Sequence, residues 1–207
     1  MPPVFEICYI TDRRSLEPKP LHPLIVEALG AGVDLVQIRE KDLATRDLLK
    51  LVEGAVSATA GTSTRVVVND RLDVALAAGA GGVHLGHQSL PADAVRGMVP
   101  GEFLVGVSCH SLAEAIAAEQ AKADYILLGP IFETPSKLAY GPPLGLEKLR
   151  EVATRVKLPL LALGGMTVDR VRPCLEAGAT GIAGISIFQS APSLDARVRE
   201  LRTQFAR

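Results

Sequence analysis

Polar side chains occur at alternate positions directly after a short apolar segment, VDLV at 33–36. Gln37, Arg39 and Lys41 are each separated by one residue. Successive side chains of a strand point to opposite faces, so these three are predicted to converge on one face. An amide, a guanidinium and an ammonium together would bind an anion, and Arg and Lys suit phosphate oxygens. The alternative is a salt-bridged surface, in which the acidic residues on either side of Lys41 neutralise the cations.

A second polar pair, Asn69 and Asp70, ends the apolar segment of VVVNDRLDVAL at 66–76. The Asp70 carboxylate could cap the helix that is expected to begin near Leu72. It could also bind Mg²⁺, an ion that proteins hold with one or two carboxylates together with substrate phosphates and water. The residues alone leave both interpretations open.

Glycines end two further apolar segments, LALGGMT at 161–167 and GIAGISIF at 181–188. Glycine lets a phosphate approach the backbone N–H groups closely. The alternative is that Gly164 and Gly165 only form a tight turn. Because Lys137 also follows an apolar segment, we favour a second phosphate site near the first. Two anion sites in one cavity predict two phosphorylated substrates.

The elements that must position these residues are short apolar runs, typical of buried parallel strands. Eight of them occur, at 5–11, 33–39, 64–69, 81–86, 102–108, 123–129, 158–165 and 181–186. Segments with helical periodicity separate them, such as LAEAIAAEQAKA at 112–123. Alternating strands and helices indicate a parallel sheet, and eight strands close a TIM (β/α)8 barrel, an α/β fold. We predict a single domain over 1–207, with the site at the carboxyl ends of the strands.

The main competing fold is a doubly wound open sheet. Its GxGxxG fingerprint is missing after the first strand, where YITDRRSLEPKP stands at 9–20. The barrel is therefore favoured. The Pro- and Gly-rich loop FETPSKLAYGPPLG at 132–145 is long for a compact barrel, which makes it a candidate lid.

Composition limits the partners. The 207 residues carry 22 Lys and Arg against 23 Asp and Glu, a net charge of −1, and no basic block stands out. We therefore expect small-molecule substrates, no nucleic acid and no membrane. Three cysteines without CxxC or zinc spacing argue against a disulfide scaffold, which predicts a cytoplasmic protein. A homodimer is left open.

No convincing nucleophile is found. Cys109 and His110 are adjacent, so on an extended chain they point to opposite sides, and Cys109 is interpreted as a small buried hydrophobe beside a satisfied histidine. His84 could be a base, but we favour a core histidine bonded to backbone.

From YITD at 9–12 to GISIF at 184–188 the chain resembles the thiamine phosphate synthase family. The matching motifs are QIREK, VNDRLDVAL, GVHLGHQSLP, GVSCHS, DYILLGPIFETPSK, LALGGM and GIAGIS. The resemblance implies a TIM barrel that couples hydroxymethylpyrimidine diphosphate to a thiazole phosphate, or carboxythiazole phosphate, releasing pyrophosphate with Mg²⁺ as cofactor.

The resemblance also implies roles for individual residues. Those that would hold the pyrimidine diphosphate are Gln37, Arg39, Lys41, Asn69, Ser108 and Lys137. Those that would hold the thiazole phosphate are Thr134, Ser136, Gly165, Ile185 and Ser186. The three cations Arg39, Lys41 and Lys137 would be catalytic because they neutralise the departing diphosphate, and Asp70 would bind the metal.

The chain departs from the family pattern GQxD, because it has GHQS at 86–89. Ser89 replaces the usual second metal carboxylate, and His87 replaces a glutamine. A related branch, the thiazole tautomerase, shares HSLAEA, FET and GGMT with the chain, but has a catalytic histidine where this chain has Pro130. The tautomerase is the nearest alternative function, and a barrel that binds a phosphorylated metabolite without turnover is the third.

Overall fold

The computed structural model describes residues 5–134 and 142–206. Eight parallel strands pair in chain order and close into a barrel, with β8 hydrogen-bonded to β1. The strands are β1 (Ile7–Ile10), β2 (Leu35–Ile38), β3 (Arg65–Asn69), β4 (Gly82–Leu85), β5 (Leu104–Cys109), β6 (Tyr125–Leu128), β7 (Leu160–Leu163) and β8 (Gly181–Gly184). The predicted TIM barrel is confirmed.

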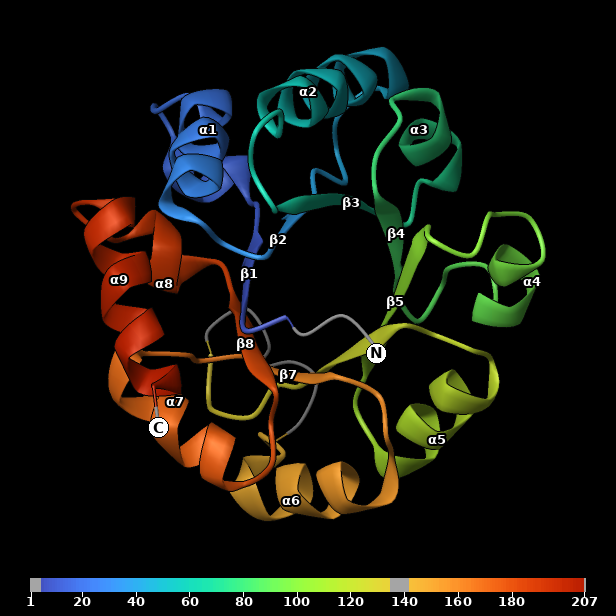
Figure 1. Ribbon diagram of the computed structural model, residues 1–207, viewed down its shortest axis with the longest axis vertical. Coiled ribbons are helices and arrows are strands. Elements are labelled where there is room, and N and C mark those ends of the chain that lie inside the picture. The colour runs from blue at the N-terminus through green and yellow to red at the C-terminus, as the bar shows by residue number, and fades with distance from the viewer. Residues whose placement is uncertain (1–4, 135–141, 207) are drawn as a thin grey trace.

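Helices surround the ring of strands in the view along the barrel (Figure 1). They are η1 (Arg13–Leu16), α1 (Leu21–Ala31), α2 (Thr45–Ala58), α3 (Leu72–Ala77), α4 (Ala92–Arg96), α5 (Leu112–Gln120), α6 (Gly145–Arg155), α7 (Val168–Glu176), α8 (Ser186–Gln189) and α9 (Leu194–Phe205). Each strand except β8 leads through one crossover into the next, and α9 packs between α1 and α7 to complete the ring.

Strand alternation divides the core into two parts. Side chains that point out of the barrel form the larger apolar cluster with the helices. Those that point inward form a smaller one: Phe5, Cys8, Ile10, Leu35, Val67, Leu104, Tyr125, Leu127, Leu161 and Ala183. Two residues further along β2 and β3 the inner positions become polar, as Gln37 and Asn69. The barrel therefore has a filled apolar interior and a polar mouth at the carboxyl ends of its strands.

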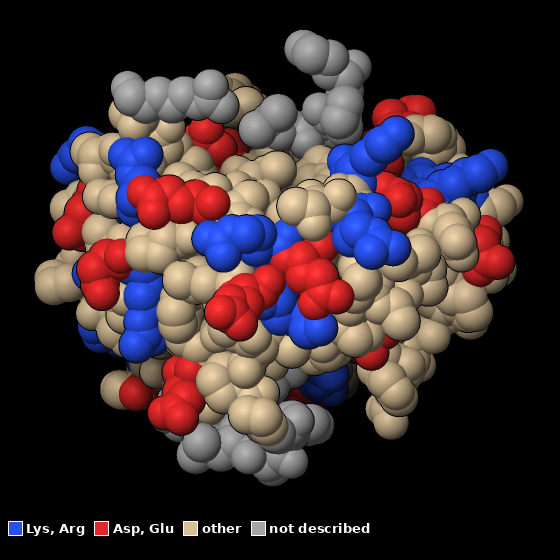
Figure 2. Space-filling view, turned by 90° about the horizontal axis from the view of Figure 1, so that it is seen from below, with Lys and Arg blue, Asp and Glu red and all other residues tan. Residues whose placement is uncertain are grey.

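The surface carries interspersed charges. On the face drawn in Figure 2, Lys and Arg side chains alternate with Asp and Glu rather than gathering by sign. None of the helices in the described parts of the chain combines the length and apolarity that crossing a membrane requires.

Candidate active site

The predicted cationic face of β2 lies at the mouth of the barrel. Gln37 is 1% exposed, and its Nε2 donor has no hydrogen-bond partner among the described residues. Arg39 is half-buried and Lys41 is exposed, with its Nζ 3.9 Å from Asp70 Oδ2. Arg39 forms no ion pair within the described ranges. A buried amide donor without a partner, beside two cations, is an arrangement that an anionic ligand would complete.

The salt-bridged alternative for this face is wrong, because the neighbouring acids point elsewhere. Asp42 pairs with Arg13 and with Arg14, whose Nη2 lies 2.8 Å from Asp42 Oδ2. Glu40 is buried on the opposite face of the strand end. Neither carboxylate neutralises the cations on the inner face.

Glu40 instead ties the end of β1 to the end of β2. Its Oε1 accepts a hydrogen bond of 2.6 Å from Thr11 Oγ1, and its two oxygens accept from the Arg13 N–H at 3.2 and 3.1 Å. Thr11 Oγ1 in turn accepts from the Arg39 N–H at 2.9 Å. Burial raises the pKa of Glu40, while these hydrogen bonds oppose the shift. The backbone that carries Arg39 is thereby anchored from behind.

Asp70 adopts a left-handed conformation with φ 61° directly after β3. Its Oδ1 accepts from the Gly86 N–H at 3.2 Å and from Ser89 Oγ, and its Oδ2 accepts from Asn69 Nδ2 at 2.7 Å. Partial burial alone would raise the pKa of Asp70, but these hydrogen bonds and the Lys41 charge outweigh it and lower the pKa. Asp70 is therefore an ionised carboxylate at neutral pH.

The helix-capping interpretation of Asp70 is wrong. The residue at the N-cap of α3 is Arg71, and no side chain caps that helix. The Asp70 carboxylate turns toward the β4–α4 turn, where Ser89 replaces the carboxylate of the family pattern. Within the described residues no group of three or more His, Cys, Asp and Glu could hold a metal ion. One carboxylate is nevertheless enough for Mg²⁺ when substrate phosphates and water complete its shell.

Deeper in the barrel, His84 connects two hydroxyl groups. Its Nε2 lies 2.8 Å from Ser108 Oγ, and its Nδ1 lies 3.2 Å from Tyr125 Oη. Burial lowers the pKa of His84 to about 3, which keeps the imidazole neutral. The expected core position of His84 is found, but the ring nitrogens bond to side chains rather than to backbone.

The ends of β7 and β8 carry the predicted thiazole-phosphate residues. Gly164 and Gly165 have φ of 98° and 63°, and a Cβ on Gly165 would lie 2.4 Å from the carbonyl oxygen of Glu133. The turn thus requires both glycines, and phosphate binding there stays a prediction. Ile185 is the N-cap of α8 and Ser186 is its first residue, exposed to solvent.

The β6–α6 segment approaches this turn. Arg170 Nη1 donates to the Gly165 carbonyl at 2.5 Å, and its guanidinium lies 4.6 Å from the centre of the Phe132 ring. Thr134, two residues after Phe132 in the chain, is half-buried. Ser136 and Lys137, with most of the proposed lid, lie outside the described residues.

Cys109 and His110 are adjacent in the chain but lie in different surroundings. Cys109 is buried, and burial raises the pKa of its thiol to about 12. His110 lies on the other side, with Nδ1 3.3 Å from Glu114 Oε2. Neither residue is arranged to activate the other.

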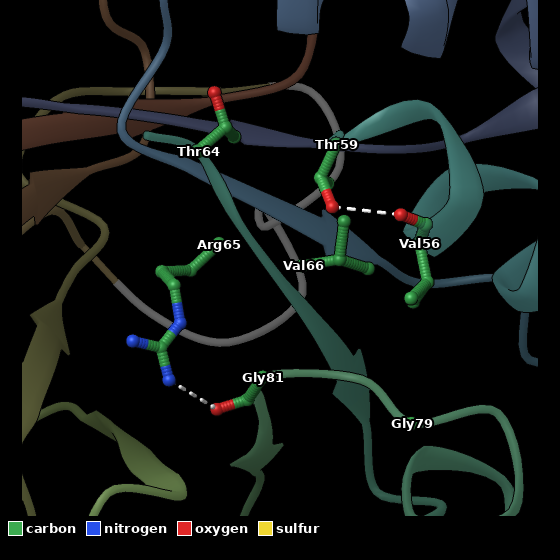
Figure 3. Close-up of a pocket in the computed structure, with 7 residues that line it drawn as sticks. All are labelled: Val56, Thr59, Thr64, Arg65, Val66, Gly79 and Gly81. Atoms are coloured by element: carbon green, nitrogen blue, oxygen red, sulfur yellow. Dashed lines mark hydrogen bonds between the residues drawn. The ribbon is translucent and has the colours of Figure 1, made fainter. Parts of the chain in front are cut away.

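A hollow of about 160 Å³ lies at the opposite end of the barrel (Figure 3). It is lined by Val56, Thr59, Thr64, Arg65, Val66, Gly79 and Gly81. Arg65 Nη2 donates to the carbonyls of Gly81 at 3.3 Å and Glu102 at 3.0 Å. Active sites of this fold lie at the carboxyl ends of the strands, so this hollow at their amino ends is not the candidate site.

Comparison with known proteins decides which family the barrel belongs to. The model of the thiamine monophosphate synthase family matches residues 7–188. The chain belongs to this family. It is 40% identical over 197 residues to the thiamine-phosphate synthase of Roseiflexus sp. (strain RS-1), covering 95% of this chain and 84% of that one. It is 44% identical over 179 residues to that of Methanoculleus marisnigri, covering 86% and 85%.

A solved structure agrees with these relatives. Thiamine phosphate pyrophosphorylase from Pyrococcus furiosus superposes with a TM-score of 0.86 at 35% identity, covering 97% of this chain and 95% of that chain. The resemblance predicted from the motifs is thus confirmed, over the sequence and over the fold.

Sequence reasoning missed the residues that support the site from behind. Thr11 follows β1 among the polar strand ends, but its hydrogen bonds to Arg39 and Glu40 depend on the pairing of β1 with β2. Tyr125 stands inside the apolar run YILL, where no pattern distinguishes it from an ordinary core residue. The contacts of both residues depend on how neighbouring strands pair in the folded barrel.

Proposed function

We propose that the chain is a thiamine-phosphate synthase, a transferase of thiamine biosynthesis that couples hydroxymethylpyrimidine diphosphate to a thiazole phosphate with release of pyrophosphate. The observation that carries the proposal, beside family membership, is the β2 strand end. There a buried amide donor without a partner, Gln37, stands below two cations, Arg39 and Lys41.

Each substrate would take one part of the mouth. The pyrimidine diphosphate would lie against β2, β3 and β5, held by Gln37, Arg39, Lys41, Asn69 and Ser108, and Lys137 is proposed as a further ligand. The thiazole phosphate would lie against β7 and β8, on the backbone N–H groups near Gly165, Ile185 and Ser186, with Thr134 and Ser136 from the same loop. The first N–H groups of a helix lack intrahelical partners and favour anions.

The proposed reaction begins with cleavage of the bond between the pyrimidine methylene carbon and the diphosphate oxygen. The diphosphate leaves with the electron pair, and the methylene cation is stabilised by the pyrimidine ring. The lone pair of the thiazole nitrogen then forms the new C–N bond. This route needs no protein nucleophile, which agrees with the buried, protonated thiol of Cys109.

The protein contributes charge and alignment. Arg39 and Lys41 would stabilise the negative charge that develops on the leaving diphosphate, an effect that is strong where water is excluded. Alignment of the two substrates converts an encounter into a reaction within one complex. The tie between Thr11 and Glu40 holds the β2 end in place while this occurs.

Mg²⁺ is the proposed cofactor. Asp70 would hold it, because its carboxylate is ionised, partly exposed and 3.9 Å from Lys41. When bound, the ion would neutralise charge on the diphosphate. Ser89 adds no charge, so we expect the protein to bind Mg²⁺ weakly until a diphosphate supplies further oxygens.

The test is to incubate the purified protein with both substrates and Mg²⁺ and to measure thiamine phosphate. We expect product, and we expect Arg39→Gln to lower turnover strongly. Arg14→Gln is the matched control, because Arg14 pairs with Asp42 on the exposed surface. Absence of product combined with proton exchange on carboxythiazole phosphate would favour the tautomerase, and bound pyrimidine diphosphate without product would favour the non-catalytic barrel.

The position equivalent to the tautomerase histidine is Pro130, which has no group that could move a proton. We propose that the protein works in the cytoplasm, since all three cysteines are free and buried. A homodimer stays a prediction.

A further inference from the structure

Three polar side chains form a continuous line inside the barrel, from its closed interior to its mouth. Tyr125 and His84 are almost completely buried, with exposed fractions of 0% and 1%, whereas Ser108 is half-buried. Tyr125 Oη lies 3.2 Å from His84 Nδ1, and His84 Nε2 lies 2.8 Å from Ser108 Oγ. The proposed reaction gives no role to Tyr125 or to His84.

The hydrogen atoms of this line can be assigned by counting donors and acceptors. The hydroxyl hydrogen of Tyr125 is buried, and the single hydrogen bond of that hydroxyl within the described residues is to His84 Nδ1. If Nδ1 carried the ring hydrogen, the Tyr125 hydrogen would be buried without an acceptor, which disfavours that arrangement by roughly tenfold or more. Nδ1 is therefore the acceptor and Tyr125 the donor.

A neutral imidazole carries one hydrogen, so it must be on Nε2. The Nε2–H then donates to Ser108 Oγ, and the hydroxyl hydrogen of Ser108 is not used by His84. No other partner of Ser108 Oγ occurs in the part of the chain that the structure describes. Because Ser108 is the half-buried end of the line, its hydroxyl hydrogen is available to a ligand in the mouth.

We propose that Tyr125, His84 and Ser108 form a one-directional donor chain that presents the Ser108 hydroxyl as a hydrogen-bond donor to an unprotonated ring nitrogen of the pyrimidine substrate. This inference rests on the proposed function, since it takes Ser108 to face that substrate. Ser108 is the residue that touches the ligand, and His84 and Tyr125 are positioning residues that fix the direction of its hydroxyl.

The choice of a ring nitrogen follows from charge. His84 is neutral, and the residue that pairs with Ser108 on the neighbouring strand is Leu127. Arg39 and Lys41 follow β2, three strands away from Ser108 on β5. The Ser108 hydroxyl and the His84 imidazole that bonds to it are both neutral, which suits the neutral acceptor of the ring, while the diphosphate belongs with the cations.

The first experiment determines the tautomer of His84 in the complete chain without ligand. Protein labelled with ¹⁵N in its histidines is measured by NMR, and the His84 signals are identified by their loss in His84→Gln. We expect an unprotonated Nδ1 and a protonated Nε2. A hydrogen on Nδ1 would overturn the donor chain, whatever the enzyme makes.

The second experiment is a double-mutant cycle on binding of hydroxymethylpyrimidine diphosphate, measured by calorimetry. Tyr125→Phe keeps the ring that packs on Phe5 and removes only the hydroxyl. We expect it to weaken binding by about fivefold to tenfold in the parent, and by less than about twofold in a Ser108→Ala background. Equal losses in both backgrounds would overturn the proposal, because Tyr125 would then act independently of Ser108.

Tyr9→Phe is the matched control. Tyr9 is fully buried on β1, and its hydroxyl has no hydrogen-bond partner among the described residues. It belongs to the outer apolar cluster, packed on Phe188. Removing this hydroxyl should change neither the tautomer of His84 nor ligand affinity. A change equal to that of Tyr125→Phe would overturn the proposal, since loss of any buried hydroxyl would then have the same effect.

Two smaller probes locate the acceptor. We expect Ser108→Ala to weaken binding of unphosphorylated hydroxymethylpyrimidine and to leave binding of inorganic pyrophosphate unchanged. The reverse pattern would place the acceptor on a phosphate oxygen and refute the ring nitrogen. A parent chain that neither binds the pyrimidine diphosphate nor makes thiamine phosphate would refute the proposed function together with this role. Nδ1–H in an active parent would refute the donor chain alone.

Discussion

Replacing Ser89 by aspartate tests the electrostatics of the proposed metal site. In the parent, Ser89 Oγ donates to Asp70 Oδ1, and the Gly86 N–H donates to both side chains, at 3.2 Å to Asp70 and 2.7 Å to Ser89. Ser89→Asp removes a hydroxyl donor to a charged group, which costs about 1.5–3 kcal/mol in a buried setting. Because the Asp70 side chain is 34% exposed, we expect the lower end of that range.

The second contribution is repulsion between the two carboxylates. Two like charges about 4 Å apart repel by roughly 1–4 kcal/mol for effective dielectric constants between those of water and a protein surface. Together the two effects predict a loss of about 2.5–5.5 kcal/mol in the free energy of unfolding at neutral pH without metal. The repulsion raises the carboxyl pKa, so its share of the loss appears as pH rises and shrinks as pH falls toward about 4.

Mg²⁺ should reverse the loss in the variant. An ion bound only by the folded state stabilises it by about 2.7 kcal/mol at a hundredfold excess over its Kd. The assay is urea unfolding of the parent and of Ser89→Asp over a range of Mg²⁺ concentrations, followed by the turnover of both. We expect a large Mg²⁺-dependent stabilisation in the variant, a small one in the parent, and faster turnover in the variant.

Ser89→Asn is the control, because it removes the hydroxyl and adds no charge. It should lose stability without gaining any response to Mg²⁺. The reasoning is refuted if Ser89→Asp is as stable as Ser89→Asn at neutral pH without metal and responds no more strongly to Mg²⁺. The two carboxylates would then not face each other, and Asp70 would not be a metal ligand in the way proposed.

Three further predictions address the barrel. Asp34→Ala removes the Oδ2 that accepts from the N–H groups of Glu6 at 2.9 Å and Ile7 at 2.8 Å, and should cost about 2–4 kcal/mol in urea unfolding. Burial lowers the pKa of His84 from 6.5 to about 3, so between these pH values the unfolded chain binds more protons than the folded chain. The free energy of unfolding should therefore fall by about 1.4 kcal/mol for each pH unit below about pH 6. His84→Gln should reduce this dependence of stability on pH. Glu40→Ala should lower kcat by roughly tenfold or more by releasing the β2 end, whereas Glu40→Gln retains an acceptor and should lose less in the same steady-state assay.

The sequence predicted the fold because each strand is a local pattern. All eight apolar runs contain strands. Seven strands lie within their runs, as β2 at Leu35–Ile38 lies within 33–39, and β5 extends one residue past the run 102–108, to Cys109. Period-two alternation predicts Gln37, Arg39 and Lys41 on one face, but β2 ends at Ile38, so only Gln37 of the three lies within the strand. The same alternation puts Glu40 on the other face, so the sequence already argued against Glu40 as the ion-pair partner of these cations. Its actual partners could not have been predicted, since they lie 27 to 29 residues away.

The line of polar groups through the barrel was harder to predict from the sequence. His84 pairs in register with Gly106, and Gly106 pairs with Tyr125. A Cβ on Gly106 would lie 2.2 Å from Tyr125 Cζ, so the missing side chain is the space that the Tyr125 ring occupies to reach His84. In the sequence, Gly106 is an ordinary glycine within a strand, where it would suggest a bulge or a close approach without naming the partner.

The contact of His84 with Tyr125 therefore depends on three strands at once. β4 supplies the acceptor His84, β5 supplies Gly106, which has no side chain, and β6 supplies the donor Tyr125, whose ring occupies the space beside Gly106. Any side chain at Gly106 would separate the two rings, and Ser108, two residues further along the same strand, would lose the direction that His84 gives to its hydroxyl. A glycine that holds no group of its own thus connects the apolar interior of the barrel to the chemistry at its mouth.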